Sequence, residues 1–323
     1  MRPPASRPIK LVIQIPCLNE EGTLGIALAA LPKRIEGVDT IEVIVVDDGS
    51  TDRTAEVARS FGVAAVVSLG VNRGLARAFS AGLEEALARG ADIVVNTDAD
   101  NQYNADDIAG LVRPILEGRA DLVVGARPIR SIAHFSPAKK VLQRLGSRVM
   151  RTLSRTEVAD APSGFRAMSR HAAERLVVLT DYSYTMETLI RAGHGRLRVA
   201  SVPVRVNGDL RPSRLVKSIP SYIRRSGATM LRVWSSFVAP QGMGTVAALA
   251  LLASPVAGWC GGAGAAAGSV AFGLVMLACA SIADSLCMNR RLLEDIRARQ
   301  LRASIPAVGG EERVSEPVAL AAE

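Results

Sequence analysis

The stretch IEVIVVDDGSTD, residues 41–52, decides the fold class of this chain. It starts as an apolar, β-branched run, which is typical of a buried strand, and it ends in two acidic residues and a glycine. Thr51 or Asp52 is suited to cap a helix, and residues 52–61 then carry apolar side chains at helical spacing. A buried strand followed by a polar loop and a helix is the repeating unit of a parallel α/β sheet.

The same unit recurs along the N-terminal part of the chain. Strands are predicted at Leu11–Pro16, Ile41–Asp47, Ala64–Ser68, Asp92–Asp98 and Asp121–Gly125. Helices are predicted between them at Glu21–Ile35, Asp52–Phe61, Leu75–Arg89 and Ala105–Glu117. Further on, the pattern predicts helices at Pro137–Arg155 and Ser169–Leu179 and a strand at Leu197–Val206. This alternation predicts a doubly wound, mostly parallel sheet.

Polar residues gather where three of the predicted strands end. Asn19-Glu20 follows the first strand, Asp47-Asp48 ends the second, and Asp98-Ala99-Asp100 ends the fourth. In open α/β sheets, ligands bind at the carboxyl ends of the strands. We therefore expect the three clusters to form one site.

Two of these clusters contain paired carboxylates. Asp98 and Asp100 fall in a loop, so both are able to turn toward one hard cation. Mg²⁺ or Mn²⁺ held by one or two carboxylates plus substrate phosphates is the usual arrangement for phosphate-bearing ligands. The D-x-D pattern alone is also common in surface loops, and its position after a buried strand is what favours a metal site. Asp47 and Asp48 repel each other unless a donor or a ribose hydroxyl lies between them.

The composition calls for an anionic partner. The 323 residues carry a formal net charge of +8, and the mean hydropathy of +0.22 is high for a purely soluble enzyme. Nucleic acid, anionic lipid and a phosphorylated substrate all fit such a charge. The four cysteines form no CxxC pair, which argues against a zinc site or a disulfide framework. The apolar run Leu11–Cys17 is too short for a signal peptide, so we expect the catalytic part to stay in the cytosol.

The C-terminal third has the pattern of a membrane anchor. Residues 211–234 interleave basic and apolar side chains, which favours a membrane surface over nucleic acid, although a solvated helix face is the other interpretation. Residues 233–283 contain no charged residue and no histidine. A membrane-spanning helix needs about 20 apolar residues, so there is room for two spans, near Val238–Ala257 and Ala263–Ala283, with a glycine-rich turn. A buried hairpin of a soluble protein is the alternative.

Arginines flank the uncharged stretch on both sides, so the positive-inside rule places both of its ends in the cytosol. We therefore expect a multi-pass protein of the inner (plasma) membrane with a cytosolic catalytic domain. The predicted parts are a catalytic domain at 1–210, a basic amphipathic juxtamembrane segment at 211–234, a transmembrane hairpin at 235–284, and a basic cytosolic segment with a disordered tail at 285–323.

Six motifs, in order along the chain, carry a resemblance to a known family. They are Pro16-Cys17-Leu18-Asn19-Glu20-Glu21, Val46-Asp47-Asp48-Gly49-Ser50-Thr51-Asp52, Asn72-Arg73-Gly74, Asp98-Ala99-Asp100-Asn101-Gln102, Gly125-Ala126-Arg127 and Ser163-Gly164-Phe165-Arg166. Together they resemble the family 2 glycosyltransferases with the GT-A fold, specifically the dolichol-phosphate mannose synthase group. Ala126 stands where the family often has Ser. The resemblance implies an inverting, metal-dependent transfer of a hexose from a nucleotide-sugar to a polyprenyl phosphate.

The resemblance also implies roles for the matching positions. Those implied to bind the nucleotide-sugar are Pro16, Asn19, Glu20, Asp47, Asp48, Arg73 and Asp98. Those implied to hold the metal and the diphosphate are Asp98, Asp100 and Gln102. Arg127 is implied to bind phosphate, and Asp160 is a candidate base or acceptor-orienting residue. Tyr184 and Glu187 resemble a further family element.

A polyprenyl phosphate acceptor fits a site without an evident general base. A sugar hydroxyl must be activated by a base, whereas a lipid phosphate is already anionic at neutral pH and needs only alignment and charge screening. The residues expected to screen it are Arg127, Arg166, Arg211 and Arg214. Lys139, Lys140 and Arg144 are further candidates, for which a solvated surface charge is an equal interpretation.

Several other functions compete with this hypothesis. A processive polysaccharide synthase usually carries a Gln-x-x-Arg-Trp motif, which neither Trp234 nor Trp259 completes. A nucleotidyltransferase usually has a glycine-rich phosphate loop near its N-terminus, and residues 16–25 are not one. A catalytically silent nucleotide- or lipid-binding scaffold has no need of a metal site. A glycosyltransferase with a different acceptor stays open, as do the sugar and the choice between GDP and UDP.

Overall fold

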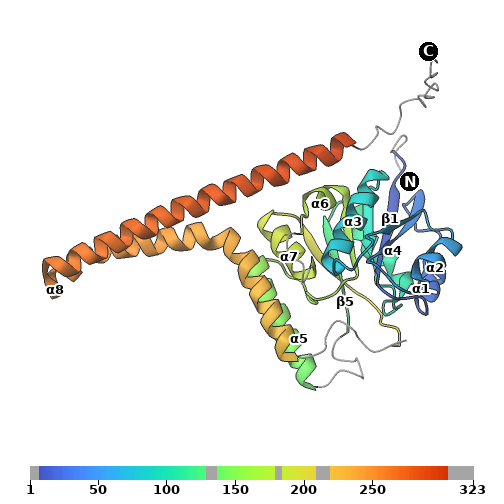
Figure 1. Cartoon of the computed structure of the whole chain (residues 1–323), viewed down its shortest axis with the longest axis horizontal. Helices are drawn as coiled ribbons and strands as arrows, with labels where there is room; N and C mark the ends of the chain where they lie inside the picture. The colour runs from blue at the N-terminus through green and yellow to red at the C-terminus, as the bar shows by residue number, and fades with distance from the viewer. Residues whose placement is uncertain (1–6, 129–136, 179–183, 209–218, 305–323) are drawn as a thin grey trace, which may run out of the picture.

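The computed structural model describes residues 7–128, 137–178, 184–208 and 219–304. Within these residues one seven-stranded sheet has the order β3-β2-β1-β4-β6-β5-β7 (Figure 1). The strands are β1 (Lys10–Cys17), β2 (Thr40–Asp47), β3 (Ala65–Ser68), β4 (Ile93–Asn96), β5 (Leu122–Ala126), β6 (Arg166–Ser169) and β7 (Val199–Pro203). All pairs are parallel except those of β6, which runs antiparallel to both β4 and β5. The predicted mostly parallel α/β sheet is confirmed.

The helices of the described part are α1 (Leu24–Ala30), α2 (Thr54–Ser60), α3 (Leu75–Ala88), the 3-10 helix η1 (Ala105–Asp107), α4 (Ile108–Leu116), α5 (Pro137–Ser154), α6 (Arg170–Arg175), α7 (Tyr184–His194) and α8 (Ile219–Ser304). The predicted strands and helices are present, most with shorter or shifted ends. The sequence pattern missed β6 and α7. The strand β6 is only four residues long and begins with an arginine, so it lacks the apolar run that marks the other strands.

Helices cover both faces of the sheet. Side chains alternate along β1, so that Leu11, Ile13 and Ile15 pack with α1, α2 and α4, while Val12 packs on the other face with α3, α6 and α7. All four of these β1 residues are fully buried. Burying each such side chain stabilises the fold by about 1.5–3 kcal/mol. The parallel strands are therefore held in register from both sides, and their carboxyl ends lie along one edge.

The helix α8 leaves this core and turns back on itself (Figure 1). Its one residue with non-helical geometry is Gly262, whose φ of 76° is readily adopted by glycine and falls within the turn predicted from the sequence. Near the turn the two arms are close together: a Cβ built on Gly273 would lie 2.8 Å from Leu251. In the described residues, Gly242–Asn289 is long and apolar enough to cross a membrane by length and composition. Arg211, Arg214 and the predicted disordered tail lie outside the described residues.

Gly82 provides a test of how closely α3 packs on the sheet. A Cβ added there would lie 2.6 Å from Gln14 Oε1 and 2.9 Å from Val46 Cγ2. We expect Gly82→Ala to lower the free energy of unfolding by about 1–3 kcal/mol, because overpacking a core outweighs the gain in helix propensity. The measurement is urea unfolding of the purified protein.

The matched control is Gly110→Ala in α4. A Cβ there meets only Val202 at an ordinary 3.7 Å. This variant is expected to be neutral or slightly stabilising, since alanine is favoured over glycine by roughly 1 kcal/mol inside a helix. Equal effects of the two substitutions would show that α3 has room to move.

Candidate functional site

The three predicted polar clusters meet at the carboxyl ends of neighbouring strands. Since β1 lies between β2 and β4, the loops that follow these strands emerge side by side. Cys17, the last residue of β1, has a buried thiol that lies near carboxylates of all three clusters. Burial, and after it the carboxylates of Glu20, Asp47 and Asp98, raise the pKa of Cys17 well above its usual value. One thiol thus lies near carboxylates of all three clusters, which agrees with the expectation that the clusters share one site.

The loop after β1 is fastened to the loop after β2. Asn19 has a φ of 54°, a conformation that asparagine tolerates better than most residues. Its backbone N–H donates to Ser50 Oγ at 2.9 Å, and its side-chain Oδ1 accepts from the N–H of Thr51 at 2.8 Å. The N–H of Glu20 donates to Thr54 Oγ1 at 2.7 Å. These hydrogen bonds hold the two predicted nucleotide-binding motifs together as one wall of the site.

The acidic pair that ends β2 is stabilised by backbone donors. Asp48 accepts from the N–H of Arg73 at 2.7 Å and from that of Gly74 at 2.9 Å. Asp47 accepts from the N–H of Ser50 at 2.9 Å. Each of the two carboxylates is therefore stabilised by its own peptide N–H donors. Glycine is needed at position 49, because its φ is +78° and a Cβ there would lie 2.5 Å from the backbone carbonyl carbon of Val71.

The D-x-D loop directly follows β4, and its Asp98 and Asp100 are half-buried. Asp100 Oδ1 accepts from the N–H of Gln102 at 3.2 Å. From the segment after β7, the side-chain amide of Asn207 donates to the Asn101 carbonyl at 2.9 Å, and the Asn207 N–H donates to the Gln102 carbonyl at 2.9 Å. A segment distant in the sequence thus closes the loop that carries the predicted metal ligands.

The donor set of this loop fits a hard divalent cation that is shared with a phosphate ligand. Carboxylate oxygens are the ligands that Mg²⁺ and Mn²⁺ prefer. In the described part of the chain, no group of three or more His, Cys, Asp or Glu is placed to hold a metal. A cation bound by Asp98 and Asp100 therefore needs further ligands from substrate and water, which is how Mg²⁺ usually binds.

Gly164 leaves space beside Asp98. A Cβ built on this glycine would lie 3.1 Å from one carboxylate oxygen of Asp98 and 2.9 Å from the hydroxyl of Tyr184. The Gly164 N–H donates to the Tyr103 hydroxyl at 3.2 Å, and its carbonyl accepts from Asn96 at 2.9 Å. The Ser163-Gly164-Phe165-Arg166 motif therefore packs directly against the D-x-D loop, and we call it the floor of that loop.

Arg127 and Asp160 form a buried ion pair. Arg127 Nε and one terminal nitrogen donate to the two Asp160 oxygens at 2.6 and 3.1 Å, and the side chains are 13% and 1% exposed. Burial by itself lowers the pKa of Arg127, but Tyr103 and Asp160 raise it above its ordinary value, so the guanidinium stays charged. With both carboxylate oxygens engaged, Asp160 fits the role of holding Arg127 better than the role of a base.

The predicted role of Arg166 at the acceptor phosphate does not fit the structure. Its side chain is fully buried. The guanidinium donates to the carbonyls of Ser163 and Ala161 at 2.8 and 2.7 Å and to Thr188 Oγ1 at 2.6 Å. Burial lowers the pKa of Arg166 to about 10, which still leaves it charged at neutral pH. Arg166 therefore fixes the turn before β6 and joins it to α7, with no surface left for a lipid phosphate.

Other predicted residues are placed less fully. Pro16 is buried in β1, and Arg73 is exposed at the rim of the site. The side chains of Lys139, Lys140 and Arg144 lie outside the described part, as do Arg211 and Arg214. Glu187 is fully buried and pairs with Arg191 at 2.9 Å, so it supports α7 from within.

Three polar side chains behind the D-x-D loop were missed: Gln14, Asn96 and Tyr103. Tyr184, which the sequence linked to a further family element, lies beside them and accepts a hydrogen bond from Asn96. Gln14 and Asn96 interrupt otherwise apolar strands, and that interruption is the signal that could have found them. Tyr184, the first residue of α7, is buried against Phe79 of α3. Burial, and next the Asp98 carboxylate, raise its pKa well above the usual value.

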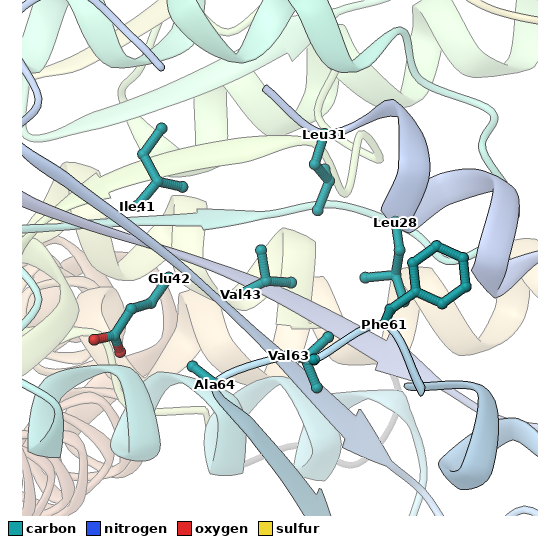
Figure 2. A pocket seen from close by; sticks show the side chains of 9 residues that line it. Leu28, Leu31, Ile41, Glu42, Val43, Phe61, Val63 and Ala64 are labelled. Atoms are coloured by element: carbon teal, nitrogen blue, oxygen red, sulfur yellow. The ribbon is translucent and has the colours of Figure 1, made fainter. Parts of the chain in front are cut away.

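A hollow lined by Glu42 and by several apolar side chains lies elsewhere on the domain (Figure 2). Its apolar lining includes Leu28 of α1, Leu31 just after that helix, Val43 of β2, and Phe61 and Val63 before β3. It borders the starting half of β2, away from the strand ends that carry the carboxylates, and it shares no residue with the candidate site.

The Arg127–Asp160 pair yields a stability prediction. Asp160→Asn leaves a largely buried guanidinium without its counter-charge, so the free energy of unfolding should fall by roughly 3 kcal/mol. Replacing both partners, as in Arg127→Gln with Asp160→Asn, should restore part of this loss. Urea unfolding of the four proteins in the cycle measures the coupling.

The control for this cycle is Glu117→Gln, which removes an exposed partner of Arg113 and Arg119. Such surface pairs are worth at most about 1 kcal/mol. An Asp160→Asn variant as stable as this control would contradict the buried pair.

Comparison with known proteins agrees with this geometry. The sequence profile described as glycosyl transferase family 2 matches residues 12–177. A UDP-N-acetylglucosamine–dolichyl-phosphate N-acetylglucosaminyltransferase from Methanococcus voltae is 30% identical over 216 residues, which cover 59% of this chain and 83% of the relative. A polyprenol monophosphomannose synthase from Mycolicibacterium smegmatis is 26% identical over 206 residues, 60% of this chain and 76% of the relative.

Among solved structures, glucosyl-3-phosphoglycerate synthase from Mycobacterium tuberculosis, in complex with Mn²⁺, UDP and glucosyl-3-phosphoglycerate, superposes with a TM-score of 0.55. It is 27% identical, and the match covers 70% of this chain and 80% of that one. The family match spans β1 to α6 and so includes every strand end that carries the site. The chain belongs to glycosyl transferase family 2.

Proposed function

We propose that this glycosyltransferase moves a hexose from a GDP- or UDP-linked donor to a polyprenyl phosphate at the cytosolic face of the inner membrane, with inversion and with Mg²⁺ or Mn²⁺. The observation that carries the acceptor class is α8. A catalytic domain of this family continues into a long apolar helix on which Leu249, Leu252 and Leu274 are more than half exposed. Two relatives are named for transfer to dolichyl phosphate or for making a polyprenol phosphosugar.

The chemistry assigned to each side chain follows from its position. Asp98 and Asp100 would hold the divalent ion, which when bound neutralises charge on the leaving diphosphate. The wall built by Asn19 and Asp48 would receive the nucleoside. Arg127, kept charged and oriented by Asp160, would meet a phosphate through charge-assisted hydrogen bonds. No base is required, because the acceptor oxygen is already anionic.

The membrane part of the proposal rests on the exposed surface of α8. We propose that residues 235–284 cross the bilayer as a hairpin that turns at Gly262. Side chains such as Leu252 and Val256, 76% and 65% exposed, leave a large apolar area without a protein neighbour in the described structure. A surface of this kind is stable in hydrocarbon rather than in water. Close contact between the arms at Gly273 is typical of helices that pack in lipid.

The helix α5 supports a catalytic domain that rests on the bilayer. It contains no acidic residue, and Leu145 and Val149, one turn apart, are 56% and 43% exposed. Arg148 and Arg151 are exposed beside them. The helix lies against the first part of α8 (Figure 1). An apolar pair bordered by arginines suits the surface of an anionic membrane.

A second acceptor deserves a test because of the solved structures. Several structures of glucosyl-3-phosphoglycerate synthase hold phosphoglyceric acid beside UDP-glucose and Mn²⁺. Phosphoglycerate also presents an anion to an arginine, so Arg127 would suit either acceptor. A soluble acceptor gives no reason for the apolar surface of α8, and we therefore favour the lipid.

The activity prediction uses membranes that contain the full chain, labelled UDP- and GDP-sugars, and either polyprenyl phosphate or phosphoglycerate. We expect a labelled, acid-labile lipid product with one donor and no labelled phosphoglycerate. Asp100→Ala should lower transfer roughly a hundredfold, because Lewis-acid stabilisation is worth several kcal/mol.

The control is Asp106→Ala, which removes an exposed carboxylate six positions further along. It should leave transfer unchanged. Full activity of Asp100→Ala, or activity that survives EDTA, would reject the metal assignment. Transfer to phosphoglycerate alone would reject the lipid acceptor.

The topology prediction uses a cysteine that is already present. Cys260 is exposed next to the Gly262 turn. After Cys17, Cys279 and Cys287 are replaced, a membrane-impermeant maleimide added to intact spheroplasts should label Cys260. A Ser304→Cys reporter in a chain without Cys260 should be labelled only after lysis. The reverse pattern would overturn both the hairpin and the cytosolic active site.

A further inference from the structure

A pair of buried amides links the middle of the sheet to the floor of the D-x-D loop. Gln14 in β1 and Asn96 in β4 are partners in the strand register, and both are fully buried. Gln14 Nε2 donates to Asn96 Oδ1 at 2.9 Å and to the Phe79 carbonyl at 3.4 Å. Polar groups in a core cost free energy relative to apolar ones. Where these groups are hydrogen-bonded they rigidify their surroundings, and in the described residues Gln14 Oε1 is the buried atom of this pair that has no partner.

Asn96 extends this pair toward the site. Its Nδ2 donates one hydrogen to the Gly164 carbonyl at 2.9 Å and the other to the Tyr184 hydroxyl at 3.1 Å. Both donors and the acceptor of the amide are therefore used. A tyrosine hydroxyl has one hydrogen to give. Because Tyr184 accepts from Asn96, its own hydrogen has to point toward a different acceptor.

The ring of Tyr184 has no freedom to turn away. It stacks on Phe79 with ring centroids 4.1 Å apart and an interplanar angle of 16°. On the ring also lies the guanidinium of Arg166, 5.9 Å from the centroid. Arg166 is itself held by three hydrogen bonds. The direction of the hydroxyl is thus set by packing before any ligand binds.

The carboxylate that borders this hydroxyl belongs to Asp98. A Cβ placed on Gly164 would lie 2.9 Å from the Tyr184 oxygen and 3.1 and 3.4 Å from the two Asp98 oxygens. The hydroxyl and the carboxylate therefore flank the same glycine and lie within about 6 Å of each other. Glycine at this position keeps the space between them open.

We propose that Tyr184 is a positioning residue for the metal ligand Asp98. Its hydroxyl, aimed by Asn96 and Gln14, fixes the rotamer in which the Asp98 carboxylate meets the divalent ion. The inference rests on the proposed metal-dependent transfer. Hydrogen-bond partners behind metal ligands orient those ligands, and their loss typically costs 10- to 100-fold in metal affinity or activity.

The test is Tyr184→Phe, which keeps the stack on Phe79 and removes only the hydroxyl. Purified full-length protein is titrated with Mn²⁺ in the presence of UDP or GDP, and free Mn²⁺ is followed by its EPR signal. We expect the Kd for Mn²⁺ to rise about tenfold. The KM for Mn²⁺ in the transfer reaction should rise in parallel, and kcat should recover at saturating Mn²⁺.

The matched control is Tyr103→Phe, which removes an equally buried hydroxyl from the N–H side of the Gly164 peptide. It should change the Kd for Mn²⁺ much less than Tyr184→Phe does, and the Tm values of the two metal-free variants should be similar. Equal Mn²⁺ affinity in Tyr184→Phe and the wild type would overturn this inference alone. The inference would also be overturned if Tyr184→Phe lowered both the Tm and the affinity for nucleotide in the absence of metal, because the role of the hydroxyl would then be structural. No Mn²⁺ binding by the wild type would overturn the proposed metal dependence as well.

Discussion

Carboxylates from three strands crowd one edge of the sheet, and their mutual repulsion is the constraint under which the site folds. Backbone N–H groups of the chain offset most of this repulsion by donating hydrogen bonds to the carboxylates. Asp48 accepts two N–H groups from the Arg73–Gly74 loop, and Asp47 accepts one from Ser50. Asp160 takes the guanidinium of Arg127 instead. Hydrogen bonds to a charged group are stronger than neutral ones, so the carboxylates also determine how the loops around them are shaped.

This constraint explains why the catalytic motifs are spread over the sequence and yet form one rigid unit. Hydrogen bonds join the loop after β1 to the loop after β2, and Asp48 in the latter to the backbone of Gly74. Another hydrogen bond joins the D-x-D loop to Asn207, which follows β7. Each of these hydrogen bonds joins segments that are far apart in the chain. Substrate atoms would enter a site whose walls already have fixed positions, which lowers the entropy lost in reaching the transition state.

The parts of this architecture that the sequence predicted depend on local patterns. Apolar runs that end in acidic residues located β1, β2 and β4, and the strand-end rule then brought Asn19, Asp48 and Asp98 together. The uncharged stretch after Arg232 marked the apolar helix in the same way. The resemblance added the family, which the profile match and the solved structures support.

The parts that were missed depend on long-range contacts. A four-residue antiparallel strand carries too little pattern to be recognised, so β6 was not predicted. Arg166 was assigned to phosphate because an exposed and a buried arginine look the same in a sequence. Its burial follows from acceptors on two other segments, the Ala161 carbonyl and Thr188. Asp160 was a candidate base for the same reason, since its partner Arg127 is 33 residues away.

Gly164 also limits which substitutions this chain is able to accept. Its missing side chain is the gap between a metal ligand and the tyrosine beneath it, and any Cβ would press on both at once. A larger residue at this position fits only if position 184 loses its hydroxyl or the loop after β4 shifts. Positions 98, 164 and 184 therefore constrain one another sterically in this chain.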